Sequence, residues 1–424
     1  MVKPGYRQTE IGVLPESWDT ITFENCFSIL PNNTLSRAEL NYNGGDVRNI
    51  HYGDILVKFP AVLDCSSEEL PYINKENVAK ASKGFLRDGD LIMADTAEDV
   101  IVGKSTEVIG IGDSKVVSGL HTIPCRPKDA EMFAPKWLGY FINHCTYHDQ
   151  LIPYITGIKV SSISKSAISS TVIAVPPKPE QKAIAEALSD IDTLIVNLEK
   201  LIAKKKAIKQ GAMQELLTGK RRLPGFDGEW IRVPFQKIYK FAKEGGTPST
   251  NNADFYINGN IPFAKIEDLE CKYIDSTSSY ITEAGVENSS AWLIPIHSVI
   301  LSNGATIGAV SINRIPITTK QGILGIVPSE IAEAEYLYYY FSSTRFLSEM
   351  KKITTHGTMD CAYLKDINTI ELFIPSDMKE QRAIVNVLSD MDSEIEKLGE
   401  ELYKFLGIKQ GMMSELLTGR IRLV

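Results

Sequence analysis

Apolar residues recur in steps of four and three along two stretches of the chain, Glu180–Leu223 and Glu380–Leu423, with Lys, Glu and Asp between them. This spacing places the apolar side chains on one narrow stripe of an α-helix. Two such stripes in one chain are buried most economically by packing against each other. We therefore predict two long helices that pack through the following residues: Ile184, Leu188, Ile191, Ile195, Leu198, Ile202, Ile384, Leu388, Met391, Ile395, Leu398 and Leu402.

The two stretches are copies of each other. Aligned at a constant offset of 200 residues without a gap, 23 of their 44 positions are identical. A period of this length is too long for a solenoid repeat, so it indicates a duplicated module of a globular domain followed by a helix. Prolines precede both stretches, as suits helix entries, and Gly219 and Gly419 suit C-terminal stops. A helix of forty residues would be ~60 Å long.

Short apolar runs bounded by Gly, Asp, Asn and Ser fill the two segments outside these helices and predict β-strands. The expected strands are Ile55–Phe59, Leu91–Ala94, Val100–Val102, Val172–Val175, Ile261–Ala264, Val299–Ser302, Ala309–Ile312 and Thr369–Ile374. Two further segments, Pro135–His148 and Glu333–Glu349, are expected to be helical.

The predicted fold class is α+β, with two mixed α/β domains separated by two long helices packed as an antiparallel coiled coil, and an internal pseudo-two-fold repeat. The expected boundaries are residues 1–176 for the first domain with an N-terminal arm and 177–222 for the central helix. The second domain is expected over residues 223–375 and the C-terminal helix over 376–424.

Length and composition narrow the class of protein. A chain of 424 residues holds two to four domains. No apolar run approaches the ~18 residues that span a bilayer, the N-terminus lacks the apolar core of a signal peptide, and the six cysteines form no CxxC pair. These features predict a cytoplasmic protein with reduced thiols. The net charge of −8 argues against a simple nucleic-acid binder, because Lys and Arg supply phosphate contacts.

The chain lacks the motifs of the enzymes that act on DNA. It has no NPPY, DPPY or NPPF tetrapeptide of an amino-methyltransferase and no GxxxxGK[ST] loop of a motor. Gly110–Asp113 has the wrong spacing for a nucleotide loop and fits a turn. Pro375–Gln381 resembles a nuclease PD…ExK fragment, but its charges fit the first turn of a helix better. His144 and His148 stand four residues apart without further ligands, so packing is favoured over a zinc site.

Several motifs in order along the chain carry a resemblance to a known family. They are the opening Tyr6–Trp18, RNIHYGDI at Arg48–Ile55, GGTPST at Gly245–Thr250, NGATIGAV at Asn303–Val310 followed by TTKQGI, and the helix ending ELLTG, which occurs twice. Together with the 200-residue repeat they resemble the specificity (S) subunit of type I restriction–modification systems. The first half lacks a GGTP loop near its start and departs more from the family pattern than the second.

The resemblance implies a non-catalytic subunit in which each of two target recognition domains reads one half of a bipartite, asymmetric double-stranded DNA site. It further implies partner subunits, namely two modification methyltransferase subunits and restriction/translocase subunits. S-adenosylmethionine and ATP are expected on those partners only, with no cofactor or metal on this chain. The alternatives are a specificity module of a related combined restriction–modification system, a coiled-coil scaffold without DNA affinity, and a stand-alone enzyme.

Candidate DNA contacts come from loops between strands, because a rigid frame with variable loops is the usual arrangement of recognition domains. Glycine-rich turns let backbone amides approach phosphates, Asn and Gln pair with adenine, and Lys pairs with guanine. On these grounds the candidates are Lys58, Thr96, Lys104, His121, Lys159, Gly246, Thr247, Asn303, Thr306, Lys320, Gln321, His356 and Thr358. For each of them, a solvated loop residue or a local cap is the alternative.

Overall fold

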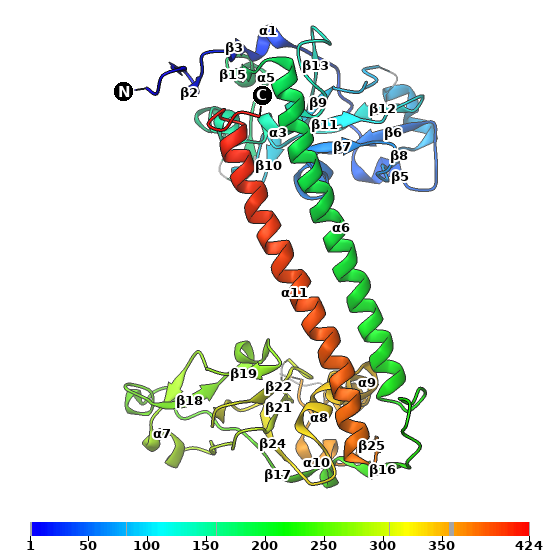
Figure 1. The fold of residues 1–424 in the computed structure, drawn as a ribbon, viewed down its shortest axis with the longest axis vertical. Coiled ribbons are helices and arrows are strands. Elements are labelled where there is room, and N and C mark those ends of the chain that lie inside the picture. Colours follow the sequence, from blue (N-terminus) through cyan, green and yellow to red (C-terminus); the bar gives the residue numbers. More distant parts are fainter. Residues whose placement is uncertain (1, 82, 158, 305, 356–359, 424) are drawn as a thin grey trace. The chain divides into compact units, whose positions relative to one another are not determined.

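The computed structural model describes residues 2–81, 83–157, 159–304, 306–355 and 360–423, and these form two compact units. The first unit combines Met1–Glu199 with Glu401–Val424, and the second is Lys200–Glu400. Two helices of 39 residues each, α6 (Lys178–Leu216) and α11 (Met378–Leu416), contribute part of their length to each unit (Figure 1). The two long helices predicted from the apolar stripes are therefore present.

Each unit has a five-stranded sheet of the same topology, in which four strands are antiparallel to their neighbours and the last pairs in parallel. In the first unit the order is β4 (Phe27–Ile29), β13 (Thr122–Pro127), β9 (Leu91–Ala94), β11 (Ser105–Ile109) and β7 (Val62–Asp64). In the second it is β17 (Tyr239–Glu244), β24 (Ile323–Pro328), β21 (Val299–Ser302), β22 (Val310–Asn313) and β19 (Tyr273–Ile274). This equivalence shows that the duplication covers the globular domains as well as the helices.

A smaller sheet accompanies each five-stranded sheet, and short strand pairs complete the units. The smaller sheets are β12 (Lys115–Ser118), β6 (Val47–Ile50), β8 (Tyr72–Ile73) and β5 (Leu40–Asn41) in the first unit, and β20 (Tyr280–Ile281), β18 (Ile261–Ala264) and β23 (Thr318–Thr319) in the second. The pairs are β1 (Tyr6–Thr9) with β2 (Gly12–Pro15), β3 (Asp19–Thr22) with β15 (Val172–Val175), β10 (Thr96–Ala97) with β14 (Ser161–Ser162), and β16 (Trp230–Pro234) with β25 (Glu371–Pro375).

Short helices cover the sheets. The α-helices are α1 (Phe23–Cys26), α2 (Tyr52–Val57), α3 (Trp137–Ile142), α4 (Cys145–His148), α5 (Lys165–Ser169), α7 (Glu283–Glu287), α8 (Ala334–Phe341), α9 (Thr344–Ile353) and α10 (Leu364–Ile367). The 3-10 helices are η1 (Arg37–Glu39), η2 (Lys75–Ala81), η3 (Ile152–Tyr154), η4 (Phe235–Lys237), η5 (Ala253–Phe255) and η6 (Ile266–Leu269). No helix of the described residues is long and apolar enough to cross a bilayer.

Two of the predicted strands are wrong. Ile55–Phe59 was expected as a strand, but Ile55 lies in α2, which begins where the His51 ring accepts a hydrogen bond from the Gly53 amide. Val100–Val102 is a turn, because the Asp99 carboxylate accepts the Ile101 amide at 3.0 Å and Val100 is left 64% exposed. Short apolar runs do not distinguish strands from helical or turn segments.

The two predicted helical segments are each divided in two. In the first, α3 ends at Ile142 and α4 begins after His144, whose ring accepts the Thr146 amide. In the second, α8 ends at Phe341, and Ser343 caps α9 by accepting the Phe346 amide. A capping side chain therefore begins the new helix at equivalent places in both units.

The long helices are antiparallel within each unit. In the second unit, Lys205 of α6 pairs with Glu394 of α11 and Lys209 pairs with Asp392, so residue numbers rise along one helix as they fall along the other. In the first unit, Lys409 of α11 pairs with Asp192 of α6 at 2.6 Å. The Asp192 and Asp392 carboxylates also accept the hydroxyls of Tyr140 at 2.8 Å and Tyr339 at 2.6 Å, which joins each domain to the helices.

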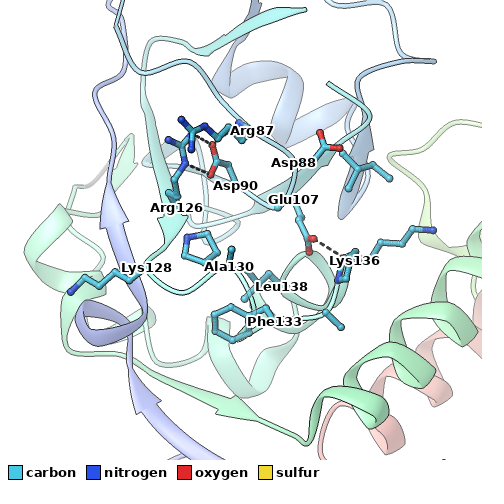
Figure 2. A pocket seen from close by; sticks show the side chains of 15 residues that line it. Arg87, Asp88, Asp90, Glu107, Arg126, Lys128, Ala130, Phe133, Lys136 and Leu138 are labelled. Carbon is cyan, nitrogen blue, oxygen red and sulfur yellow. Dashed lines mark hydrogen bonds and ion pairs between the residues drawn. The ribbon is translucent and has the colours of Figure 1, made fainter. Parts of the chain in front are cut away.

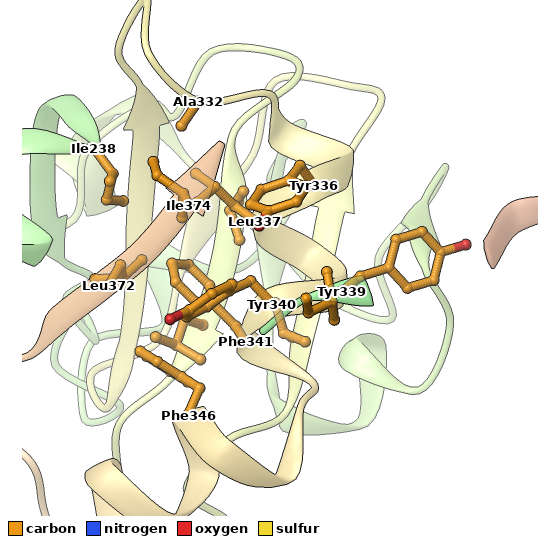
Figure 3. Packing of buried hydrophobic residues seen from close by; sticks show 14 of the residues in the cluster. Ile238, Ala332, Tyr336, Leu337, Tyr339, Tyr340, Phe341, Phe346, Leu372 and Ile374 are labelled. Atoms are coloured by element: carbon orange, nitrogen blue, oxygen red, sulfur yellow. The ribbon is translucent and has the colours of Figure 1, made fainter. Parts of the chain in front are cut away.

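The predicted stripe residues are all buried or half-buried. The first two of each stripe do more than pair the helices. Ile184 and Leu188 belong to the core of the first domain, and Ile384 and Leu388 belong to the core of the second. The second core is rich in aromatic side chains from α8, with Tyr340 and Phe341 packed beside Phe346, whereas Tyr339 points away from them (Figure 3).

The same buried ion pair closes each unit. In the second unit the Glu380 carboxylate, at the start of α11, accepts hydrogen bonds from Arg222 at 2.6 and 2.7 Å and from the Trp230 indole at 3.3 Å. In the first unit Glu180 accepts the Trp18 indole at 2.9 Å and the Arg422 guanidinium at 2.7 Å. In the first unit the tryptophan and the arginine that bind this carboxylate thus come from opposite ends of the chain, whereas in the second unit both come from one continuous segment.

Candidate nucleic-acid interface

Three loops of the first unit meet at one end of the five-stranded sheet: the turn after β9, the turn before β13, and the hairpin closed by the antiparallel bridge between Thr156 and Ser162. The Asp95 amide donates to the His121 carbonyl at 3.1 Å, and the Ile163 amide donates to the Asp95 carbonyl at 2.9 Å. Strand β10 pairs with β14 and ties the first loop to the hairpin. The structure therefore brings together the predicted contacts Thr96, His121 and Lys159, and Lys159 is exposed.

The other two candidate lysines of the first unit are already engaged. The Lys104 amine donates to the Leu56 carbonyl at 2.8 Å, and burial lowers the pKa of this amine. The Lys58 amine lies 2.7 Å from the Glu68 carboxylate, and the hydrogen bond between them raises the pKa of Lys58. Contact of either amine with DNA would require it to exchange these partners, so both stay predictions.

In the second unit, two distant loops combine beside the equivalent sheet end. The Gly246 amide donates to the Thr319 carbonyl at 3.0 Å, and the Gln321 amide donates to the Thr247 hydroxyl at 3.3 Å. Thr247, Lys320 and Gln321 are exposed there. Three of the predicted contacts are thus gathered on one surface of this unit, and the buried Gly246 lies beneath them in the same loop.

Asn303 does not fit the expectation that it contacts a base. Its side chain is fully buried, its amide nitrogen donates to the Ala362 carbonyl at 3.0 Å, and its backbone binds Gly322 and Ala362. Asn303 therefore holds together the loops of this end of the sheet and offers no edge to a ligand. Thr306, from the adjoining loop, is exposed. His356 and Thr358 lie outside the described residues.

A cavity of about 590 Å³ lies in the first unit at the other end of the sheet, where β9 begins. Its charged lining is satisfied internally, as Figure 2 shows: Arg126 makes a bidentate pair with the buried Asp90, at 2.8 and 2.6 Å. On the opposite wall the buried Glu107 carboxylate accepts the amides of Lys136 at 2.6 Å and Gly139 at 2.9 Å. These charges hold α3 and β13 in place.

Glu107 makes the stability of the first unit depend on pH. Burial raises the pKa of this carboxyl to about 7, although the hydrogen bonds that it accepts from backbone amides act to lower the pKa. A raised acid pKa means that the folded state binds the proton more tightly, so the contribution of Glu107 to stability is fully present below pH 4.5 and is lost as pH rises through 7. Between pH 5.5 and pH 6.5 we expect the free energy of unfolding of the first unit, measured by urea denaturation, to fall by about 1 kcal/mol. Glu107→Gln should remove this slope, and an unchanged slope in the variant would contradict the assignment.

His144 and His148 have structural roles. The His144 ring caps α4, burial lowers its pKa, and the His148 Nε2 lies 2.9 Å from the Val102 carbonyl. Among the described residues no group of three or more His, Cys, Asp or Glu side chains could hold a metal ion. The contacts of both rings are thus local and structural.

Sequence reasoning missed the groups that surround His121. Asp95 lies 3.3 Å from the His121 Nδ1, and Tyr52 packs edge-on against the ring with centroids 5.2 Å apart. Alignment of β9 with β21 would have shown that Asp95 occupies the position of Asn303, which was a candidate contact. Asp95 would then have been a candidate as well. The secondary structure around Tyr52 was not predicted from the sequence, and no sequence pattern indicated that Tyr52 would contact this loop.

Two equivalent domains that present dissimilar loops at the same end of their sheets, each packed on a pair of long helices, define a duplicated recognition protein. The model of the type I restriction modification DNA specificity domain matches this chain twice, over residues 41–210 and 229–402. The chain therefore belongs to this family, as the sequence motifs predicted.

Individual relatives agree with the family assignment. A protein described as the specificity subunit of the type I restriction enzyme MjaX, from Methanocaldococcus jannaschii, is 22% identical over 98% of this chain and 96% of its own length. The EcoR124I/EcoR124II specificity subunit of Escherichia coli is 30% identical over 39% of this chain and 42% of its own. The crystal structure of a type I S subunit from M. genitalium shares the fold, with a TM-score of 0.54 and 14% identity over 94% of this chain and 96% of that one.

Proposed function

We propose that this chain is the sequence-reading subunit of a type I restriction–modification complex and that each unit reads one half of an asymmetric, bipartite site on double-stranded DNA. The observation that carries the proposal is that equivalent sheet ends hold unlike residues: Thr96 and His121 in one unit, Lys320 and Gln321 in the other. Side chains of this kind hydrogen-bond to base edges and phosphates. Because the two sets differ, the two half-sites should differ as well.

We further propose that catalysis belongs to partner subunits, with S-adenosylmethionine and ATP bound there and none on this chain. Two modification methyltransferase subunits and the restriction/translocase subunits would assemble with it in the cytoplasm. Exposed apolar side chains on the long helices support a partner surface: Leu194 and Val196 on α6, and Tyr403 and Leu406 on α11. A partner that contributes cations would also offset the net charge of −8, which opposes DNA binding by the chain alone.

A domain exchange tests this function. The chain is co-expressed with the methyltransferase encoded beside it, and modified sites are mapped by sequencing. Replacement of residues 231–375 by the corresponding domain of another family member should change one half-site and leave the other unchanged. The matched control exchanges residues 19–175 and should change the opposite half. If both halves change, neither changes, or the purified chain methylates or cleaves DNA by itself, the proposal is wrong.

A further inference from the structure

His121 has a backbone conformation that its counterpart in the second unit leaves to glycine. It precedes β13 in the same register in which Gly322 precedes β24, and both have positive φ, 54° for His121 and 86° for Gly322. A side chain other than Gly is uncommon in this region, and its presence in a loop suggests a function. The first unit therefore places an imidazole where the second unit has bare backbone.

The surroundings of the ring determine which nitrogen carries the proton. The Thr96 hydroxyl donates to the Asp95 carboxylate at 2.8 Å, so the two oxygens that lie 3.3 Å from the His121 Nδ1 both act as acceptors. Nδ1 must then be the donor. Nε2 has no partner among the described residues, and the side chain is 46% exposed. A neutral ring would present a lone pair at Nε2, and a charged ring would present a second N–H.

The groups that face the ring are an acidic side chain, a basic side chain on the same surface and a tyrosine. Asp95 lies against Nδ1, and the loop shares its sheet end with Lys159. Tyr52 contacts the ring edge-on and separates it from His51, whose pKa is lowered chiefly by burial and whose Nδ1 accepts the Gly53 amide. Behind His51, Arg37 pairs with Asp54 at 2.9 Å. An acceptor on negatively charged DNA that approaches Nε2 would favour a proton on this nitrogen, because an acceptor binds a donor.

On the basis of the proposed function, we infer that His121 is a DNA contact of the first unit that takes up a proton on binding and donates from Nε2 to an acceptor on the DNA. The acceptor is a phosphate oxygen or the N7 or O6 edge of guanine, since both accept from a cation. Asp95 and Thr96 position the ring, and Tyr52 fixes its plane. Recognition by the first unit is thereby linked to pH, whereas the second unit has Gly322, with no titratable side chain, at this place.

The test uses the complex with its methyltransferase and a pool of DNA duplexes with a randomised centre. After selection, the affinity for the enriched duplex is measured from pH 6 to pH 8. Binding of the unchanged protein should weaken about tenfold over this range, because the histidine must be charged in the complex. His121→Asn, which tolerates positive φ, should flatten the profile. The matched control is His297→Asn: His297 is exposed, has φ 59° and precedes β21 at the opposite end of its sheet, so this variant should keep the profile.

The outcomes separate the two proposals. If no sequence is enriched at any pH, the proposed function itself fails. If a bipartite sequence is enriched but His121→Asn has the pH profile of the unchanged protein, only the role of His121 is wrong. A uniform loss of affinity in His121→Asn identifies a phosphate contact, and relaxed preference at one position of one half-site identifies a base contact.

Discussion

Replacement of Glu380 by alanine is expected to lower the unfolding free energy of the second unit by about 3 kcal/mol. Its carboxylate is buried, and both oxygens accept hydrogen bonds from the Arg222 guanidinium, one of them also from Trp230. The substitution removes the anionic partner of the guanidinium, which keeps only the Gly228 carbonyl at 2.9 Å, and the acceptor of the indole N–H. It also removes the link between the end of α6, β16 and the start of α11. Urea unfolding followed by tryptophan fluorescence measures the loss, and hydrogen exchange of residues 216–234 locates it.

The matched control is Glu394→Ala on the same helix. Glu394 pairs with Lys205 at 2.6 Å, but the side chains are 49% and 32% exposed, so water and salt screen the pair. We expect a loss below about 1 kcal/mol. Glu180→Ala should reproduce the effect of Glu380→Ala in the first unit, because Arg422 and Trp18 occupy the equivalent places. Equal small losses for Glu380 and Glu394 would show that the buried pair does not hold the second unit together.

The helices were the most predictable part of the fold. An apolar stripe that is repeated at a fixed offset indicates the type of secondary structure, the length of the helix and the duplication of the chain. The closure of the first unit was not predictable. Glu180 and Arg422 are 242 residues apart, and only the folded backbone shows that the C-terminal end completes the N-terminal domain. The Glu-Gln motif at the start of each long helix was a partial signal that the two units close in the same way. Gln181 and Gln381 each accept a backbone amide from the loop before a domain helix, α3 in the first unit and α8 in the second.

The candidate contacts were predicted by residue type, and residue type does not determine exposure. Thr247, Lys320 and Gln321 proved to share one surface because a glycine turn and a strand end happen to adjoin in space. Asn303, which the same reasoning placed on the DNA, is buried among backbone groups. Local sequence shows which side chains could bind a base, but packing decides which of them reach the surface.

Replacement of Gly246 by alanine is expected to abolish selective recognition by the second unit while most of the fold survives. An added Cβ would lie 2.4 Å from the Ala291 amide nitrogen and 2.6 Å from the Ser290 carbonyl carbon, both backbone atoms that cannot turn aside. The loop must then move away, which breaks the bond from the Gly246 amide to Thr319 and displaces Thr247 from the Gln321 amide. Overpacking of this kind costs about 1–3 kcal/mol.

The readout is the set of DNA sites methylated when the variant is co-expressed with its methyltransferase. Gly246→Ala should relax one half-site and leave the half-site read by the first unit intact, because the first unit shares none of these contacts. Gly228→Ala is the matched control: no atom lies within 4 Å of its added Cβ, and its φ is not positive, so recognition should be unchanged. If Gly246→Ala methylates the same sites as the unchanged protein, this turn takes no part in recognition, and the surface formed by Thr247, Lys320 and Gln321 would have to be rejected with it.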